Sequence, residues 1–266
     1  KPVQGWISKS RLTKGSSGAA LYVAAGGYDY WYDEDLGYSV WETKTYVKSF
    51  DVGAGTLVEK TALDLGGYVS DIQATTEALL VARNDWWSGN EGSTVTIIDI
   101  GDPDGVMITG DEIVVAGYVE SQFNMDLYNG VLRVVSGSTW SGTRTNHIQT
   151  FDATDFANLT LIDEETFGDE QSLFATLFVG NKAFFVTYQQ VDPFHAFEIT
   201  DEGDAIEHNE FIVSGWNDFF RAVNSAERLI GIGMNDENGT RKVAVSLYDI
   251  TDLTNTNPML ARAEVE

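Results

Sequence analysis

The clearest pattern along the chain is a short apolar segment that ends in an acidic residue flanked by apolar ones. The acidic residues of its five copies are Asp51, Asp99, Asp152, Glu198 and Asp249. Successive copies lie 48, 53, 46 and 51 residues apart. A regular spacing near 50 residues indicates an internal repeat. The pattern therefore predicts one strand at an equivalent place in each of five repeated units.

A second apolar run precedes each of these strands. The five runs are Ala20–Ala24, Leu79–Ala82, Val131–Val135, Ala183–Val186 and Leu229–Ile232. Short, nearly continuous apolar runs are typical of strands buried on both faces. Alternating segments upstream, such as Phe174–Val179, and more polar segments downstream, such as Leu159–Asp163, bring the expected number of strands in each unit to four.

A recurring glycine marks the junction between units, and an aromatic residue follows it at four of the five positions. These glycines are Gly5, Gly67, Gly117, Gly168 and Gly215. Glycine tolerates a positive φ or a close backbone approach, and the aromatic ring can wedge between neighbouring sheets. We therefore expect a single domain over residues 1–266 with units at residues 5–66, 67–116, 117–167, 168–214 and 215–266.

Together these patterns predict an all-β protein, because no long segment has a helical apolar period with caps at both ends. Units of about 50 residues with four strands each are typical of β-propeller blades. The sequence leaves two ways in which the ring of blades can be completed. Five blades can close unaided, or the chain can be one part of a larger ring completed by another polypeptide.

The run from Phe174 to Val191 resembles a family of secreted bacterial and archaeal proteins with a C-terminal β-propeller distantly related to WD repeats. The resemblance extends to Leu229–Gly233 with Leu247–Asp252, and to Leu132–Val134 with Trp140 and Asn146. It covers residues from about 119 to 266 and implies a propeller fold and secretion, but no catalytic residues. Members of this family are longer, which favours the larger ring.

Composition narrows the expected partners and the expected compartment. Sixteen Lys and Arg oppose 41 Asp and Glu, so the formal net charge is −25 and nucleic acid is not an expected partner. No apolar run approaches the roughly 20 residues that span a bilayer, so no membrane insertion is expected. With no cysteine, disulfides and thiolate metal sites are excluded. An acidic, Lys-poor surface favours a secreted, periplasmic or cell-surface protein.

The strongest candidates for a binding site are tryptophans in the predicted loops between the second and third strands of each unit. They are Trp31, Trp41, Trp86, Trp87 and Trp140. Aromatic rings beside Asp and Asn suit a protein or carbohydrate partner, or a cationic peptide. The alternative is that these rings only pack loop on loop. The sequence favours a non-catalytic binding scaffold that uses aromatic and acidic loops on one face.

Metal and catalytic sites have weaker support. We expect no cofactor, although calcium can be considered at three acidic segments: 99–105, Asp29 with Asp33 and Asp35, and 236–239. The three histidines form no metal-binding pair, and His195 is expected to pack inside a strand. The alternative function is a propeller hydrolase or lyase that uses carboxylates at a central channel, with or without calcium.

Overall fold

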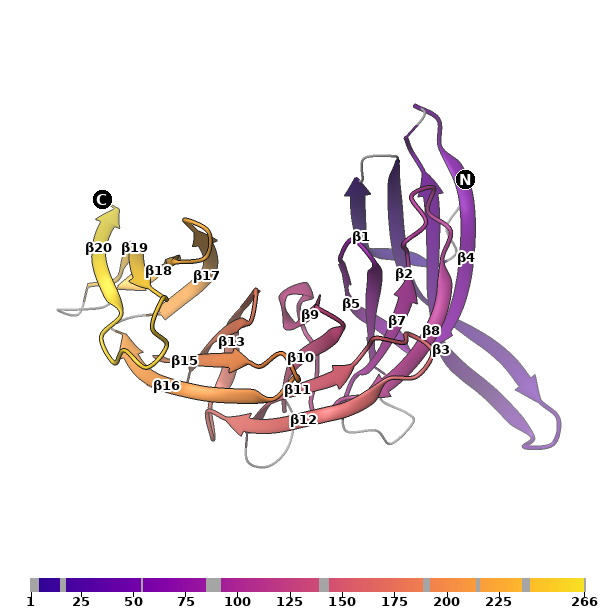
Figure 1. Cartoon of the computed structure of the whole chain (residues 1–266). Helices are drawn as coiled ribbons and strands as arrows, with labels where there is room; N and C mark the ends of the chain where they lie inside the picture. Colours follow the sequence, from indigo (N-terminus) through magenta and orange to yellow (C-terminus); the bar gives the residue numbers. More distant parts are fainter. Residues whose placement is uncertain are drawn as a thin grey trace. The chain divides into compact units, whose positions relative to one another are not determined.

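The computed structural model confirms an all-β chain built from five four-stranded antiparallel sheets (Figure 1). It describes residues 5–14, 18–53, 55–84, 92–138, 144–188, 192–213, 216–235 and 240–265. Within these ranges the helical structure is one short 3-10 turn, η1 (Gln122–Asn124). Each sheet keeps its strands in sequence order, so neighbours in the sheet are also neighbours along the chain.

The strand bounds follow the predicted repeat. The first sheet contains β1 (Trp6–Lys14), β2 (Ala19–Asp33), β3 (Tyr38–Asp51) and β4 (Val58–Gly66). The second contains β5 (Tyr68–Ala74), β6 (Ala78–Asn84), β7 (Thr94–Asp99) and β8 (Ile108–Val114). The third contains β9 (Met125–Tyr128), β10 (Val131–Gly137), β11 (Asn146–Asp152) and β12 (Thr160–Phe167). The fourth contains β13 (Ser172–Val179), β14 (Lys182–Tyr188), β15 (Asp192–Ile199) and β16 (Ala205–Val213). The fifth contains β17 (Trp216–Val223), β18 (Arg228–Asn235), β19 (Lys242–Asp249) and β20 (Met259–Val265).

The repeated acidic residue lies at or next to the end of the third strand of every sheet, and hydrogen bonds at three of these positions explain why. The side-chain Oδ1 atoms of Asp51, Asp99 and Asp249 each accept a hydrogen bond from the backbone N–H two residues later, at 2.8, 2.8 and 3.0 Å. This is an Asx turn, in which the side-chain carboxylate, in place of a neighbouring strand, accepts the hydrogen bond of the backbone N–H and the chain turns. The acid therefore ends the strand.

Contacts group the chain into two compact units, Lys1–Leu127 with Ala153–Thr160, and Tyr128–Asp152 with Leu161–Glu266. In the first unit, Tyr22 and Val47 of the first sheet share a core with Ile72, Leu79 and Val81 of the second. The strands predicted to be buried on both faces thus bury their side chains between sheets.

The second unit has two such cores. Between the third and fourth sheets, Val135 and Ile148 pack with Phe185 and Phe197. Between the fourth and fifth sheets, the core contains Phe184, Phe194, Phe220, Leu229 and Tyr248. Sheet-on-sheet burial within each unit therefore supplies most of the hydrophobic stabilisation.

A β-bulge recurs in the first strand of four sheets, near its beginning. The pairing register shifts between Ile7 and Lys9, Val69 and Asp71, Leu173 and Ala175, and Asn217 and Phe219. A bulge adds one residue to a strand and increases its local twist. The extra residues are Ser8, Ser70, Phe174 and Asp218, which share no chemistry.

The junction glycines behave as expected in part. Gly5, Gly67 and Gly168 have positive φ angles of 80°, 76° and 57°, whereas Gly117 does not adopt a positive φ. The first strand of the third sheet begins only at Met125, after a connection that includes η1. Gly215 lies outside the described residues.

One aromatic residue that follows a junction glycine does wedge between sheets. A Cβ atom added at Gly26, in the first sheet, would lie 2.3 Å from Cε2 of Tyr68, in the second sheet. We expect Gly26→Ala to lower the free energy of unfolding by about 1–3 kcal/mol through overpacking. Urea denaturation measures this, and the cost should shrink in a Tyr68→Ala background. An equal cost in both backgrounds would show that the ring does not cause the clash.

Candidate functional site

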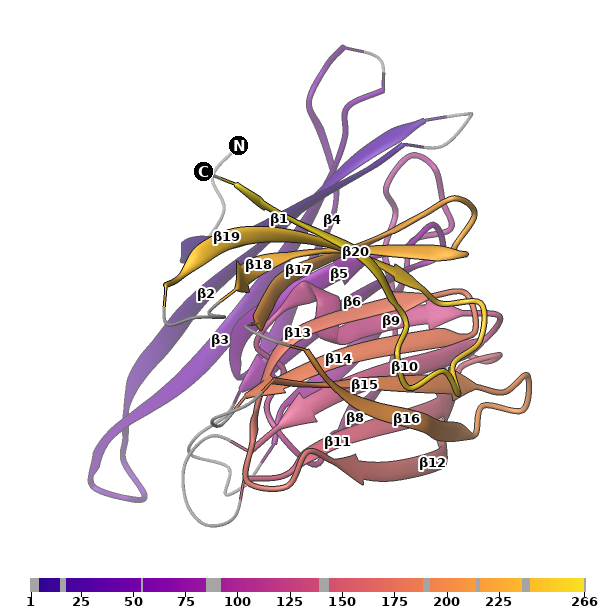
Figure 2. The ribbon, with the colours of Figure 1, turned by 90° about the vertical axis from the view of Figure 1, so that its left-hand side faces the viewer.

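The second and third strands of the first sheet continue beyond their neighbours as a two-stranded ribbon. Pairing with β1 ends at Gly26 and pairing with β4 ends at Lys44, but β2 and β3 stay paired from Tyr28 opposite Thr43 to Asp33 opposite Tyr38. Six residue pairs extend about 20 Å. The ribbon, defined as residues 28–33 and 38–43, projects from the first sheet in both views (Figure 2).

The segment around Trp31 and Trp41 was predicted as a loop, and this is wrong. Both tryptophans lie in strands, and only residues 34–37 form the turn. Asp33 Oδ1 accepts hydrogen bonds from the N–H groups of Asp35 and Leu36 at 2.9 and 3.0 Å, and Gly37 closes the turn with a φ of 72°. Tyr, Trp and Val favour strands, and alternation of side chains along this segment allows the hairpin to lengthen.

Strand alternation collects the aromatic rings on one face of the ribbon. Residues opposite each other in a hairpin share a face, so Tyr28, Tyr30 and Tyr32 lie with Thr43, Trp41 and Ser39. We call this set, together with Trp6 of β1, the aromatic face. It contains no charged side chain.

The rings of the aromatic face form a continuous series of contacts. Ring centroids lie 5.8 Å apart for Trp6 and Tyr28, 5.3 Å for Tyr28 and Trp41, and 4.4 Å for Tyr30 and Trp41. The hydroxyl group of Tyr30 is hydrogen-bonded to that of Ser39 at 2.9 Å. These four aromatic residues are 53–63% exposed. A contiguous, solvent-facing series of rings, of which Trp6 and Tyr28 are stacked and the other pairs tilted, is available for contact with a ligand.

The opposite face of the ribbon carries the acids. Asp29, Asp33 and Glu42 alternate there with Trp31, Tyr38 and Val40. Tyr46 lies on β3 near the base of the ribbon. Burial raises the pKa of Tyr46, and the negative charges of Asp29 and Asp64 raise this pKa further. Trp31 and Trp41, predicted to share one site, therefore lie on opposite faces, one acidic and one neutral.

The remaining predicted site residues cannot be placed. Trp86, Trp87 and Trp140 lie outside the described residues. The prediction missed Tyr28, Tyr30 and Tyr32, although their period of two is visible in the sequence and is the signature of one strand face.

Of the acidic segments considered for calcium, Asp29 and Asp33 lie in β2, and Asp33 Oδ1 accepts hydrogen bonds from the backbone of the turn that contains Asp35. In segment 99–105, Asp102 Oδ1 accepts a hydrogen bond from the N–H of Asp104 at 2.8 Å. Segment 236–239 lies outside the described residues. Across the described ranges, no group of three or more His, Asp or Glu side chains is arranged to hold a metal ion.

A buried polar network crosses the fourth sheet. His195, 1% exposed as predicted for a packed residue, is hydrogen-bonded through Nε2 to Thr187 Oγ1 at 3.0 Å and through Nδ1 to Glu207 at 2.7 Å. Thr187 also donates to Gln171. A hydroxyl, an imidazole and a carboxylate in this order can activate a nucleophile. Here Thr187 is fully buried, so a substrate cannot reach its hydroxyl, and the arrangement supports a structural role.

The carboxylate of Asp71 on β5, which is 4% exposed, does not resemble a catalytic acid or base. It forms ion pairs with Lys9 at 2.7 Å and Arg11 at 2.9 Å, both on β1. It also accepts a hydrogen bond from the N–H of Ile72 at 2.8 Å. A carboxylate that pairs with two cations in this way stabilises the contact between two first strands.

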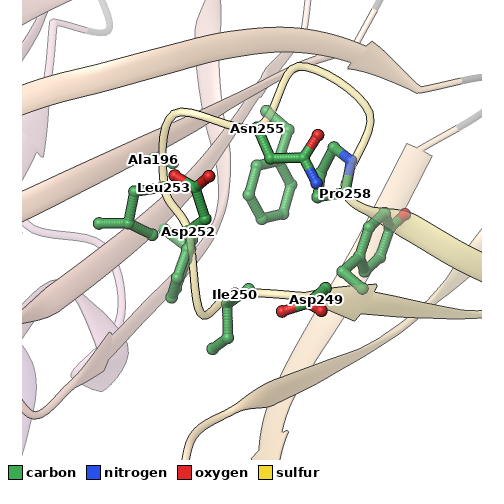
Figure 3. Close-up of a pocket in the computed structure, with 10 residues that line it drawn as sticks. Ala196, Asp249, Ile250, Asp252, Leu253, Asn255 and Pro258 are labelled. Carbon is green, nitrogen blue, oxygen red and sulfur yellow. The ribbon is translucent and has the colours of Figure 1, made fainter.

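A small pocket lies between the fourth and fifth sheets, beneath the connection from β19 to β20 (Figure 3). Its walls include Phe184, Phe194 and Tyr248, with Asp249 and Asp252 at the rim. Hydrogen bonds from Thr251 and Thr254 lower the pKa values of Asp249 and Asp252, respectively. The space is about 10 Å³, close to what one water molecule needs.

The described ranges contain no helix that is both long enough and apolar enough to cross a membrane. Five four-stranded antiparallel sheets, with an exposed ribbon on the first, define the architecture as a β-propeller type. The chain belongs to the family described as Beta propeller domain, whose model matches residues 32–263.

Two relatives are uncharacterised archaeal proteins. One, from Methanocaldococcus jannaschii, is 28% identical over 145 residues, which are 53% of this chain and 22% of that protein. The other, from Archaeoglobus fulgidus, is 28% identical over 141 residues, or 53% of this chain and 21% of that protein. The match spans about a fifth of the length of these relatives.

A solved structure of apocarotenoid oxygenase from Synechocystis is similar with a TM-score of 0.56 and 10% identity, over 98% of this chain and 62% of that one. At this identity the likeness shows the fold alone. The propeller fold is thus shared with an enzyme, and function has to be argued from the residues of this chain.

Proposed function

We propose that this chain is a non-catalytic binding scaffold in a secreted, periplasmic or cell-surface setting, and that its aromatic face binds carbohydrate. The observation that carries the proposal is the contact series Trp6, Tyr28, Trp41 and Tyr30, in which each ring is more than half exposed. Contiguous exposed apolar patches often mark binding sites when they are large. Tyr28, Tyr30 and Trp41 stand on the ribbon, which projects beyond the first sheet, and Trp6 lies beside them on β1.

The absence of charge on the aromatic face favours a neutral ligand. Sugar rings offer apolar C–H surfaces to flat aromatic rings and hydroxyl groups to polar neighbours. The aromatic face supplies both partners, since Tyr32 lies opposite Ser39 and Tyr28 lies opposite Thr43. A cationic peptide would be held best by rings beside carboxylates, but Asp29 and Glu42 lie on the opposite face of the ribbon.

The same rings also stabilise the ribbon itself. A two-stranded hairpin is marginally stable in water, and cross-strand aromatic pairs such as Tyr30 opposite Trp41 contribute about 0.2–1 kcal/mol each. A loss of binding therefore has to be separated from a loss of ribbon structure. The two tryptophans of the ribbon allow this, because they are the same residue type on opposite faces.

We expect Trp41→Ala to weaken binding of a soluble neutral glucan about tenfold or more, equivalent to ~1.4 kcal/mol, because a central ring of the series is removed. Trp31→Ala, on the acidic face, should bind as tightly as the original chain. Isothermal titration calorimetry with the glucan, and separately with poly-L-lysine, measures both affinities. Thermal unfolding should stay nearly unchanged in both variants, since the ribbon lies outside the sheet cores.

Three outcomes would count against the proposal. Binding of neither probe by the original chain would argue against a carbohydrate or cationic ligand on this ribbon. If the chain binds poly-L-lysine and Trp31→Ala abolishes this binding, the binding site lies on the acidic face of the ribbon and its ligand is cationic. An equal loss of glucan binding in both variants would mean that the ribbon structure, not the aromatic face, is needed.

A further inference from the structure

The repeat assigns each sheet a face that packs on the following sheet. In the fourth sheet this face uses Phe194 and Ala196, four and two residues before Glu198, and their partners Val186 and Phe184 on β14. These side chains are 1%, 3%, 0% and 1% exposed and belong to the core shared with the fifth sheet. In the first sheet, Val47 and its partner Ala24 occupy the same place and are fully buried against the second sheet.

The fifth sheet has the same face, but among the described residues of its unit no side chains cover it. The residues four and two positions before the repeated acid Asp249 are Val245 and Leu247. Their partners on β18 are Ile232 and Ile230, respectively. All four are aliphatic, all are partly or fully exposed, and Ile232 is 40% exposed. Their equivalents in the fourth sheet are almost completely buried.

The exposed apolar surface continues across all four strands of the fifth sheet. Phe219 on β17 pairs with Ile232 and is 44% exposed. Val243 on β19 pairs with Val265 on β20, and these two side chains are 44% and 55% exposed. The charged residues beside them are Arg221, opposite Ile230, and the ion pair of Arg228 and Asp249 at one end of the face. An apolar sheet face of this extent is typical of a surface that another element covers.

We propose that this face, defined by Phe219, Ile230, Ile232, Val243, Val245 and Leu247, binds a further four-stranded propeller sheet from polypeptide outside residues 1–266. The interface would continue the packing already present between the fourth and fifth sheets, which joins positions of the same repeat. The occupant would present the kind of apolar surface that Leu229, Tyr248 and Ile250 present to the fourth sheet. The proposal does not depend on the aromatic face.

The length of the relatives supports this choice of occupant. The matched stretches are 22% and 21% of the two archaeal proteins, so these relatives contain several times more chain than the part that matches. A sheet from such additional polypeptide can use the same strand-to-strand register and the same turn geometry. It would bury the apolar face without any new kind of interface.

Cysteine labelling tests the proposal directly, because the chain has no cysteine of its own. Ile232→Cys is prepared in the 266-residue chain and in the polypeptide encoded by the complete reading frame, and its reaction with a maleimide is followed by peptide mass mapping. Ile206→Cys is the matched control, since Ile206 on β16 is 44% exposed and lies outside the proposed interface.

We expect the thiol at position 232 to react about tenfold or more slowly in the complete polypeptide, and the thiol at position 206 to react equally in both. Equal labelling at position 232 in both proteins, or a reading frame that adds no further chain, would overturn the proposal. Slow labelling at position 232 already in the 266-residue chain would also overturn it, because the face would then be covered by this chain or a second copy.

Discussion

Replacing Phe185 with alanine is expected to lower the free energy of unfolding by about 3–5 kcal/mol, the range for truncating a buried Phe. Phe185 is fully buried on β14, and its ring centroid lies 5.0, 5.4 and 5.7 Å from those of Phe167, Phe197 and Phe178. The variant loses the transfer free energy of the ring and leaves a cavity that three other rings cannot easily fill. The core between the third and fourth sheets therefore depends on this residue.

Urea denaturation followed by circular dichroism measures the effect as a lower midpoint with an unchanged slope. Phe174→Ala is the matched control, because Phe174 lies on the neighbouring strand β13 and is 52% exposed. That variant should stay within about 0.5 kcal/mol of the original chain. Equal losses in the two variants would contradict the burial assigned to Phe185.

Thr187→Val is expected to lower the free energy of unfolding by about 1–3 kcal/mol, although valine has nearly the same shape as threonine. The substitution removes the hydroxyl that is hydrogen-bonded to His195 Nε2 and to Gln171. Both Thr187 and His195 are almost completely buried, so water cannot replace the lost partner. The expected loss is the desolvation cost of an unsatisfied imidazole nitrogen.

Thr187→Ser separates this cause from packing, since serine keeps the hydroxyl and removes a methyl group. We expect the serine variant to be more stable than the valine variant when both are unfolded in urea under the same conditions. If the valine variant were as stable as the original chain, the network around His195 would be dispensable for folding.

The sequence predicts the sheets well because burial and strand ends are encoded locally. The apolar runs Leu79–Ala82 and Ala183–Val186 lie inside β6 and β14, and each repeated acid lies at or next to the end of the third strand. Apolar side chains mark a strand covered on both faces, and an Asp side chain marks its end through a hydrogen bond to the next turn. Neither signal needs distant contacts.

Other features depend on pairing between strands and could not be predicted in the same way. The bulges insert Ser8, Ser70, Phe174 and Asp218, so no residue type identifies their place. The ribbon was interpreted as a loop because its rings lie beside Asp29, Asp33 and Asp35. Only the register of Tyr30 opposite Trp41 separates a neutral face from an acidic one.

Because an Asx turn ends the third strand, the position of that strand end does not depend on the length of the connection that follows. The connections between the third and fourth strands contain five to nine residues, yet every third strand ends at or next to its repeated acid. The carboxylates of Asp51, Asp99 and Asp249 hold only the first two residues of such a connection. The rest can gain or lose residues without moving the strand end, so these connections are places where propeller sequences can diverge while their sheets stay in register.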